Sequence, residues 1–512
     1  MKKIILSTVI SFACIAGLSA QATEFDAMRM AQSDIIGTAR YMGMAGAFGA
    51  LGGDVSAIRN NPAGLGIYRS SEMTATFNIA TQRANANWGG QTAQDDFFGF
   101  GFNNVALVLS SPTWNSRAGN TTGLLQSNWG FSYNRVRNFN RDVTVRGNDL
   151  ESSLTDYLAD FTNANRDATF DNFNVSPQAD FDRLFNDGRF AWKSLLAFEA
   201  GLIDYNNGWR SSFPAGTVDA LYHLRERGHI DEFSFSWGGN FSNRLYLGAA
   251  LNIISVNYRK IVEYNESFSH YSRNLNTFSE FGTRGNGLNA NFGIIVRPID
   301  QLRLGISYQT PTVYSNLRDD LWDDAHFNGY HTFDAFYNYQ LRTPGRLTAS
   351  AGYIFGRRAM IGADVSFVNF RSIRLFDDRG SSASYGFEND VMRNQFNRSI
   401  IAKIGAEYRL TDNLSLRAGA AKQTATMSSN ILSEPTFPML NTVRLDTDYF
   451  IHRGTTHFTA GIGYRSGFWY FDAAFVNRNF HEDFMPYASD EFSPASVVTR
   501  NFDVVATVGF RF

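Results

Sequence analysis

The chain has 512 residues, of which 15% are aromatic and 18% are charged, and its net charge is −2 at pH 7. A nearly neutral chain does not offer the basic surface that nucleic-acid binding requires, so we exclude nucleic-acid partners. The single cysteine, Cys14, lies in the N-terminal segment. Without that segment the chain has no disulfide and no thiolate metal site.

Residues 1–20 are arranged as a secretory signal peptide. Lys2 and Lys3 form a basic start, an apolar run extends to Leu18, and Ala20 ends a small-residue cleavage site. The apolar run is short for a membrane-spanning helix, which disfavours the alternative of a retained anchor. We therefore expect an exported chain.

The rest of the chain alternates apolar residues with small or polar ones, which is the period of a β-strand. The alternation is clearest in four segments, 302–308, 400–410, 414–420 and 502–512. Ile401 and Val505 are exceptions, because they are apolar on the small and polar side. In lipid, only helices and closed barrels pair every backbone group, and barrel strands place apolar side chains toward lipid. A soluble β-sandwich shows the same alternation, but seldom with a signal peptide and this aromatic content.

The predicted fold is all-β, a transmembrane antiparallel β-barrel of about 14 strands over residues 72–512. Short turns are expected at 242–243, 299–301, 356–358, 411–413 and 466–467. Longer connections alternate with them at 267–284, 315–333, 376–397, 428–455 and 481–498. Because outer-membrane barrels have short periplasmic turns and long outer loops, we expect both ends of the barrel chain in the periplasm.

The longest connection, residues 147–230, is expected to be a partly helical insertion on the extracellular side. Helical spacing is seen at Leu150, Leu154, Leu158 and Phe161, in 192–202 and in 218–227. The apolar residues of the insertion favour a cap over the barrel mouth. The alternative is a poorly ordered surface loop.

Two strands at the front of the barrel break their alternation. The phenylalanines before Asn103 lie on one parity and the apolar residues after Asn104 lie on the other. In the next strand, Arg135 continues the apolar parity, so that strand leaves the membrane or slips near Asn134. A phase slip indicates a β-bulge, and paired bulges in neighbouring strands could open the wall. These four residues are therefore candidates for the border of a lateral opening, and the alternative is an ordinary bulge at the rim.

Residues 21–71 precede the barrel and are rich in glycine and alanine, with a glycine at every third position from Gly43 to Gly52. Small residues permit close packing and unusual backbone angles. The lumen of a barrel of about 14 strands is too wide for wall side chains to fill, so we expect this segment to plug it. The candidate gating residues form a predicted turn, Asn61, Pro62, Ala63 and Gly64.

The same segment resembles the N-terminal hatch of FadL-type transporters, the outer-membrane channels for long-chain fatty acids and other hydrophobic compounds. The resemblance rests on GTARYMGMAGA (37–47), DVSA (54–57) and NPAGL (61–65). Segments 296–311, 342–355 and 458–475 resemble strand–turn–strand units of that family. The resemblance implies a plugged 14-stranded barrel, a lumenal ligand site and sideways release through a kink in the third strand. The insertion at 147–230 departs from the family pattern.

Lumenal arginines are candidate contacts for a ligand carboxylate, because the guanidinium group matches a carboxylate with two hydrogen bonds. The candidates are Arg297, Arg303 and Arg417. The alternative is that they pair with acidic residues of the wall such as Glu407 and Asp364. The histidines show no metal-site spacing and no nucleophile turn occurs, so we expect no metal, no cofactor and no catalytic residue.

These features predict a passive transporter, not an enzyme, that carries hydrophobic compounds and most simply long-chain fatty acids. The expected location is the outer membrane of a Gram-negative bacterium. The expected partners are a hydrophobic small molecule, outer-membrane lipid and lipopolysaccharide, and the chain is expected to be a monomer. The resemblance leaves open a second role, because some FadL-like barrels are assembly or docking partners of protein-secretion machinery. A general porin is disfavoured, since a plugged lumen should not conduct small solutes.

Overall fold

The computed structural model describes residues 22–164, 192–213, 216–272, 274–326, 330–432, 444–445, 447–489 and 491–512. The predicted signal peptide lies outside the described residues. No helix in the described part of the chain is both long and apolar enough to cross a membrane.

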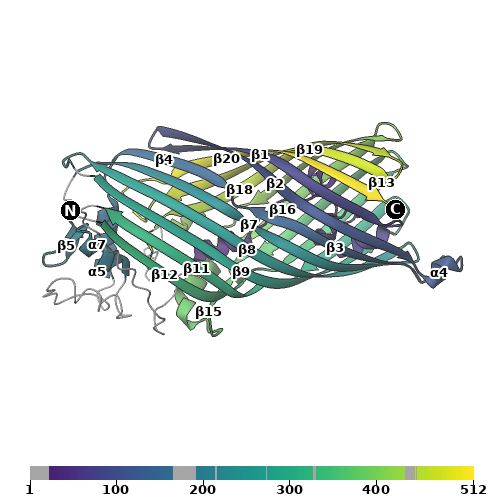
Figure 1. Cartoon of the computed structure of the whole chain (residues 1–512), viewed down its shortest axis with the longest axis horizontal. Coiled ribbons are helices and arrows are strands. Elements are labelled where there is room, and N and C mark those ends of the chain that lie inside the picture. The colour runs from purple at the N-terminus through teal and green to yellow at the C-terminus, as the bar shows by residue number, and fades with distance from the viewer. Residues whose placement is uncertain are drawn as a thin grey trace, which may run out of the picture.

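The wall of the molecule is one antiparallel sheet closed into a barrel (Figure 1). Its first strands are β1 (Glu72–Trp88), β2 (Gln91–Pro112), β3 (Leu124–Asn138), β4 (Arg141–Leu150), β7 (Val218–Phe241), β8 (Leu245–Phe268) and β9 (Asn274–Val296). The wall continues with β10 (Leu302–Gln309), β11 (Val313–His326), β12 (Tyr330–Arg342), β13 (Arg346–Phe355), β14 (Ala359–Asn369), β15 (Arg374–Asp377) and β16 (Arg398–Arg409). It ends with β17 (Leu414–Thr424), β18 (Tyr449–Ser466), β19 (Trp469–Met485) and β20 (Ala495–Arg511).

The barrel closes because β1 pairs with both β2 and β20. Some wall positions are formed by two successive strands, namely β3 with β4, β10 with β11, β12 with β13 and β14 with β15. Counted by position, the barrel has 14 antiparallel strands, which confirms the predicted fold. Short turns lie at the end of the barrel that carries the C-terminus, and the long connections lie at the other end (Figure 1). We call these the short-turn end and the long-loop end.

The predicted alternation determines which side chains of the wall face outward and which face the lumen. Leu304 and Ile306 on β10 are 45% and 50% exposed on the outer surface. The two exceptions in the pattern face inward instead. Ile401 belongs to an apolar cluster inside the barrel, and Val505 belongs to the cluster that contains Met42 of the N-terminal segment. Apolar residues on the lumenal parity therefore mark places where the interior is filled by protein.

Two neighbouring positions in the wall are interrupted at prolines. Pro311 lies between β10 and β11, and Pro344 lies between β12 and β13. Proline has no N–H to donate to a ladder, so a strand cannot continue through it on both sides. The backbone N–H of Thr343 donates to the carbonyl of Thr312 at 3.0 Å, which joins the two interruptions across the wall.

The N-terminal segment lies inside the barrel as a plug. Its helices are α1 (Glu24–Ala31), α2 (Ala39–Gly43), α3 (Ala57–Asn60) and the 3-10 helix η1 (Pro62–Ile67). Thr23 starts α1 with a reciprocal cap, because its hydroxyl accepts from the backbone N–H of Asp26 and the Asp26 carboxylate accepts from the backbone N–H of Thr23. Further elements near the long-loop end are η3 (Phe370–Ser372), η4 (Ala383–Tyr385), α8 (Gly386–Gln395) and η5 (Ser429–Leu432). A short helix, α4 (Trp114–Arg117), lies in the turn between β2 and β3.

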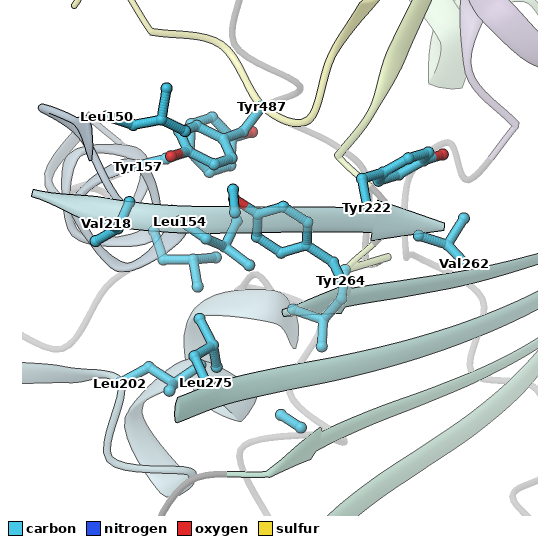
Figure 2. Close-up of a cluster of buried hydrophobic side chains, with 14 of the residues drawn as sticks. Leu150, Leu154, Tyr157, Leu202, Val218, Tyr222, Val262, Tyr264, Leu275 and Tyr487 are labelled. Carbon is cyan, nitrogen blue, oxygen red and sulfur yellow. The ribbon is translucent and has the colours of Figure 1, made fainter. Parts of the chain in front are cut away.

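The insertion between β4 and β7 forms a cap at the long-loop end (Figure 1). It contains α5 (Leu154–Ala164), α7 (Trp192–Glu199) and a hairpin of β5 (Ile203–Tyr205) and β6 (Trp209–Ser211). Leucine and tyrosine side chains of the cap meet those of β7, β8 and β9 in one buried cluster (Figure 2). The helical spacing from Leu154 to Phe161 thus matches a helix packed on the barrel, whereas Leu150, predicted to belong to the same helix, is the last residue of strand β4.

Part of the predicted loop structure is wrong. Residues 218–227, expected as a helix, form the start of strand β7, and their inward residues Val218, Ala220, Tyr222 and Leu224 are buried with period two. Most of the connections expected at 267–284 and 315–333 are also strand, because β8, β9, β11 and β12 extend far toward the long-loop end. Beyond the lipid, an outward residue need not be apolar, so these strand ends resemble loops in sequence.

Candidate functional site

Wall glycines allow the plug to lie directly on the barrel backbone. A Cβ at Gly248 would lie 2.2 Å from the carbonyl carbon of Pro62, and a Cβ at Gly362 would lie 2.3 Å from the carbonyl oxygen of Ala47. The wall residues with such plug contacts, which we call the glycine belt, are Gly238, Gly248, Gly293, Gly305, Gly352, Gly362, Gly405, Gly419 and Gly461. Because most of these sites leave no room for a side chain, the belt fixes the plug from many strands at once.

The predicted gating turn is bonded to both plug and wall. The side-chain oxygen of Asn61 accepts from the backbone N–H of Ala63 at 3.1 Å and so caps η1. Its amide donates to the carbonyl of Gly49 at 2.7 Å and to that of Ile294 on β9 at 3.3 Å. Pro62 occupies the first position of η1, where the missing N–H costs nothing. The gating role of the four predicted turn residues stays a prediction.

Three consecutive plug residues, Gln32–Asp34, hold arginines from three different strands, and we call this segment the strap. The amide oxygen of the first residue accepts from Arg137 of β3 at 2.6 Å. The hydroxyl of the second accepts from Arg346 of β13 at 2.5 Å. The carboxylate of the third pairs with Arg478 of β19 at 2.7 Å. The strap therefore spans the lumen by polar contacts rather than by backbone packing.

A cavity of about 120 Å³ lies beside the strap, between α1 and the wall. Phe25 and Met28 of α1 and Phe139 of the wall give it an apolar side. Lys403 and His457 line it as well, and both side chains are more than nine-tenths buried. The Nδ1 atom of His457 has no hydrogen-bond partner in the described chain. This composition suits a ligand with an apolar body and a polar or anionic end.

The wall is not fully paired next to this cavity. The ladder between β2 and β3 ends where Asn104 lies opposite Asn134, and the two side chains share a hydrogen bond of 2.6 Å. Within the described residues, positions 91–102 of β2 pair only with β1, Asn103 has no paired position on either neighbour, and β4 pairs only with β7. We call the unpaired edge between residues 91–103 and residues 135–150 the seam.

Both predicted phase slips correspond to register shifts. In the ladder of β1 and β2, Asn103 is the extra residue between two paired positions. In the ladder of β3 and β7, the extra residue is Val136, so the second slip lies just beyond Asn134. The carbonyl of Val136 accepts instead from the backbone N–H of Asp34 at 3.0 Å, so the strap bonds to β3 where β2 no longer does. Arg135, the remaining predicted residue, pairs with an aspartate of β7 at 3.1 Å.

A second cavity, of about 50 Å³, extends from the first toward the seam. It shares Asp34, Gln82 and Arg478 with the first cavity, and it is also lined by Asn103 and Arg135. The four predicted border residues are thus near the end of the β2 and β3 ladder. That they border an opening stays a prediction.

Comparisons with known proteins agree with this architecture. No protein-family model matches the sequence, and no curated protein is similar to it. The solved toluene transporter TodX of Pseudomonas putida has a TM-score of 0.52 and 12% identity, with 96% of this chain and 100% of that chain covered. A FadL homologue of Pseudomonas aeruginosa has a TM-score of 0.52 and 13% identity, with 94% and 99% covered. The chain has the FadL fold. At such identities the likeness concerns the fold alone.

The three arginines predicted as carboxylate contacts in this FadL-type barrel are engaged by protein groups. Arg417 pairs with Glu407 and Asp472, each at 2.7 Å. Arg303 donates to a plug carbonyl, and Arg297 pairs with an aspartate of its own turn. None of the three lines the cavity beside the strap. Their contact with a ligand stays a prediction, whereas the alternative of pairing with wall acids describes Arg417.

The mouth of the FadL-type barrel is covered by a cap that one carboxylate anchors. Glu266 of β8 accepts from the Ser153 hydroxyl at 2.5 Å, from the backbone N–H of Leu154 at 2.8 Å and from the Tyr264 hydroxyl at 2.6 Å. The first N–H groups of a helix have no partner within the helix, so a carboxylate there fixes the start of α5.

The plug contains a buried acid that titrates near neutrality. The carboxylate of Asp54 accepts from the Thr38 hydroxyl at 2.8 Å and from the backbone N–H of Ser56 at 2.9 Å. Burial disfavours its charged form and raises the pKa of Asp54 to about 6, although the nearby Arg40 acts in the opposite direction. The plug is thus held internally by a group whose charge changes in the physiological range.

Sequence reasoning missed the strap and the glycine belt. The strap residues are polar and unremarkable in composition, and only the fold shows that they meet three arginines. Part of the glycine belt can be recognised in the sequence, because each of its glycines lies on the inward parity of a strand. The sequence does not show how far each strand is shifted along the barrel, so it does not predict which glycines face the plug. No group of three or more histidine, cysteine, aspartate or glutamate side chains with metal-site geometry occurs among the described residues.

Proposed function

We propose that the chain carries hydrophobic compounds across the outer membrane and releases them sideways through the seam. The observation that carries this proposal is the continuity of the two cavities. The first contacts the strap and α1, and the second leads on to Asn103 and Arg135 where the ladder of β2 and β3 has ended. A hydrophobic compound that leaves through the wall avoids the glycine belt, which blocks the straight path through the plug.

The proposed ligand is an amphipathic molecule such as a long-chain fatty acid. Burial of its acyl chain contributes about 0.8 kcal/mol per CH₂, which the apolar side chains around Phe25 and Phe139 can supply. Lys403 and Arg137 line the same cavity, and neither forms a direct ion pair with a described carboxylate, although Lys403 lies opposite Asp364 and Arg137 interacts with Asp34. A ligand carboxylate would therefore meet two cationic side chains near the strap.

The proposed setting follows from the orientation of the barrel. We place the short-turn end in the periplasm and the cap outside, in the outer membrane of a Gram-negative bacterium, after removal of a signal peptide. The apolar outer surface faces lipid and lipopolysaccharide in this proposed setting, and the proposed state of the chain is a monomer. The turn from Asn61 to Gly64 is the proposed gate between plug and wall.

The seam can be tested with introduced cysteines, because the only native cysteine lies in the predicted signal peptide. Phe97 of β2 and Asn140 between β3 and β4 both line the second cavity, on opposite sides of the seam. A Phe97→Cys and Asn140→Cys variant, joined by bifunctional thiol reagents of graded length, should bind a labelled fatty acid but release it at least about tenfold more slowly, and reduction should restore release.

The matched control is the pair Asn104→Cys and Asn134→Cys, which lies on the paired part of the same two strands. Joining it should leave release unchanged. Equal release from the joined and the reduced seam variant would contradict lateral exit. A complete lack of saturable fatty-acid binding by the native chain would contradict the proposed ligand.

A docking role in protein secretion is the second candidate, and the cap is the observation that favours it. The cap is held to the barrel by Glu266 and a buried apolar cluster, so it offers a fixed surface at the long-loop end. Absence of ligand binding, together with retention of an exported protein on the purified barrel that is lost when residues 154–213 are deleted, would favour this role.

A further inference from the structure

A separate cavity of about 520 Å³ lies beneath the plug at the short-turn end. Its roof is formed by plug residues 51–53 and 67–70. Its walls are the ends of β10, β16, β17, β18 and β19 together with the turn residues Asp412 and Asn413. We call this cavity the vestibule. It lies on the other side of the plug from the cavity beside the strap, and the two cavities have no lining residue in common.

The vestibule has few carboxylates for the arginines around it, and two of its three acidic residues already form ion pairs. Glu407 pairs with Arg40 at 2.8 Å and with Arg417 at 2.7 Å, and Asp472 also pairs with Arg417. The third lining acid, Asp412, forms no ion pair with a described residue.

Other guanidinium groups of the vestibule remain without a carboxylate. Arg511 pairs with Glu72 of β1. The lining residues that form no ion pair in the described chain are Arg69, Arg303, Arg409 and Arg465. They come from the segment before β1, from β10, from β16 and from β18, so four separate parts of the fold direct like charges toward one space.

Part of this positive charge supports the plug, but part of it does not. Arg40 donates to the carbonyl of Gly53 at 2.8 Å, and Arg303 donates to the carbonyl of Leu51. The Nε atom of Arg303 is buried without an acceptor. The guanidinium groups of Arg409 and Arg465 donate no hydrogen bond to a described residue. Arg69, Arg409 and Arg465 are exposed, so water screens part of the repulsion among these like charges, and a bound anion would reduce it further.

We propose that the vestibule binds a compact anion with several negative charges, such as a small molecule with two or more phosphoryl groups. Each guanidinium presents a planar fork that matches phosphoryl oxygens with two hydrogen bonds. The size of the vestibule lies within the range of small-molecule pockets and is too small for a folded partner. The phosphoryl groups belong either to a soluble compound or to a lipid head group, which share this chemistry.

The site does not depend on the proposed transport function, because it lies below the plug and uses none of the residues near the seam. Arg409 and Arg465 are the residues that distinguish an anion site from a plug support, since neither bonds to the plug. We expect the native chain, purified in detergent, to bind inorganic tripolyphosphate saturably in titration calorimetry. The variant Arg409→Gln with Arg465→Gln should bind it at least about tenfold more weakly, because hydrogen bonds to charged groups are lost.

The matched control removes two exposed arginines from the other half of the barrel. Arg83 pairs only with Asp96, and Arg259 pairs only with Glu280, so the double glutamine variant loses the same charge without touching the vestibule. It should bind tripolyphosphate within about twofold of the native chain at the same salt concentration. Native electrophoretic mobility and unaltered exchange of the plug amides confirm that the vestibule variant is folded.

Competition experiments distinguish a lipid head group from a soluble compound as the source of the phosphoryl groups. Displacement of tripolyphosphate by nanodiscs that contain cardiolipin, but not by neutral nanodiscs, assigns the site to a lipid head group. Displacement by inositol phosphates with no effect of cardiolipin assigns it to a soluble compound. Absence of saturable tripolyphosphate binding, or equal affinity of the native chain and the vestibule variant, would overturn the proposal and leave fatty-acid release through the seam unaffected.

Discussion

Replacing Gly248 by alanine tests whether the glycine belt fixes the plug. The added Cβ would lie 2.2 Å from the carbonyl carbon of Pro62 and 2.3 Å from the backbone nitrogen of Ala63. Both are backbone atoms, so no side chain can turn away to make room. Gly282→Ala on β9 is the matched control, because its Cβ would come no closer than 3.5 Å to any described atom, the carbonyl oxygen of Tyr258.

The expected magnitude follows from overpacking. Forcing an extra carbon into a filled site typically costs about 1–3 kcal/mol. Alanine in place of glycine also restricts the unfolded chain, which stabilises the folded state by about 0.5–1 kcal/mol. The control variant Gly282→Ala has the same stabilisation, so it cancels in the comparison. The remaining cost of about 1–3 kcal/mol destabilises the docked plug. The population of the undocked state should therefore rise roughly 5- to 150-fold relative to the control.

Hydrogen–deuterium exchange of peptides from residues 43–66, in detergent or nanodiscs, measures that population. Gly248→Ala should speed plug exchange by this factor while the β8 and β9 amides stay protected, and Gly282→Ala should match the native chain. Heat-modifiable migration in electrophoresis checks that the barrel has formed. Plug exchange in Gly248→Ala that equals the control would refute the argument that backbone contact with the wall holds the plug.

Three further changes test other parts of the fold. Because the pKa of Asp54 is raised from 3.8 to about 6, its stabilising contribution to the plug is present below about pH 4 and is lost as the pH rises through 6, by about 3 kcal/mol. After correction for the intrinsic pH dependence of amide exchange, the plug amides should therefore be less protected at pH 7.5 than at pH 5, and Asp54→Asn should remove this difference in protection. Leu158→Ala deletes a fully buried side chain of the cap and should destabilise it by about 2–5 kcal/mol, seen as easier proteolysis of the cap with an intact barrel. Arg417→Gln leaves Glu407 and Asp472 with fewer partners and should lower barrel stability to urea by about 3–5 kcal/mol, whereas Arg83→Gln, which breaks an exposed pair, should leave the urea midpoint unchanged.

The lipid-facing part of the barrel could be predicted from the sequence because the bilayer constrains each strand. Leu304 and Ile306 alternate with small residues for that reason alone, and a closed barrel is the solution that pairs every backbone group. Outside the lipid this constraint ends. Residues 218–227 are rich in charged and apolar side chains, so the sequence predicts a helix there, although Tyr222 and Leu224 are buried as strand residues.

The interior could be predicted only in part. The small residues of the plug indicated close packing, and the prediction of a plug needed nothing more than the width of the lumen. The strap could not be predicted, because its contacts depend on where β3, β13 and β19 bring Arg137, Arg346 and Arg478. Such contacts join residues more than a hundred positions apart, and no local pattern in the sequence records them.

The contrast between belt and strap indicates where the plug can move. Most belt glycines bring the wall backbone against the plug backbone, and Gly293 and Gly352 bring it against the side chains of Asn61 and Leu51, so a displacement there produces clashes on several strands at once. Strap contacts are hydrogen bonds and an ion pair between flexible side chains, which can exchange one anionic partner for another without a steric clash. The strap also supplies the partner for Val136 at the point where β3 leaves β2. A ligand anion that competes with Asp34 for Arg478 would therefore weaken the contact of the strap with β3 while the belt stays in place, so a change at the seam does not require the plug to leave the barrel.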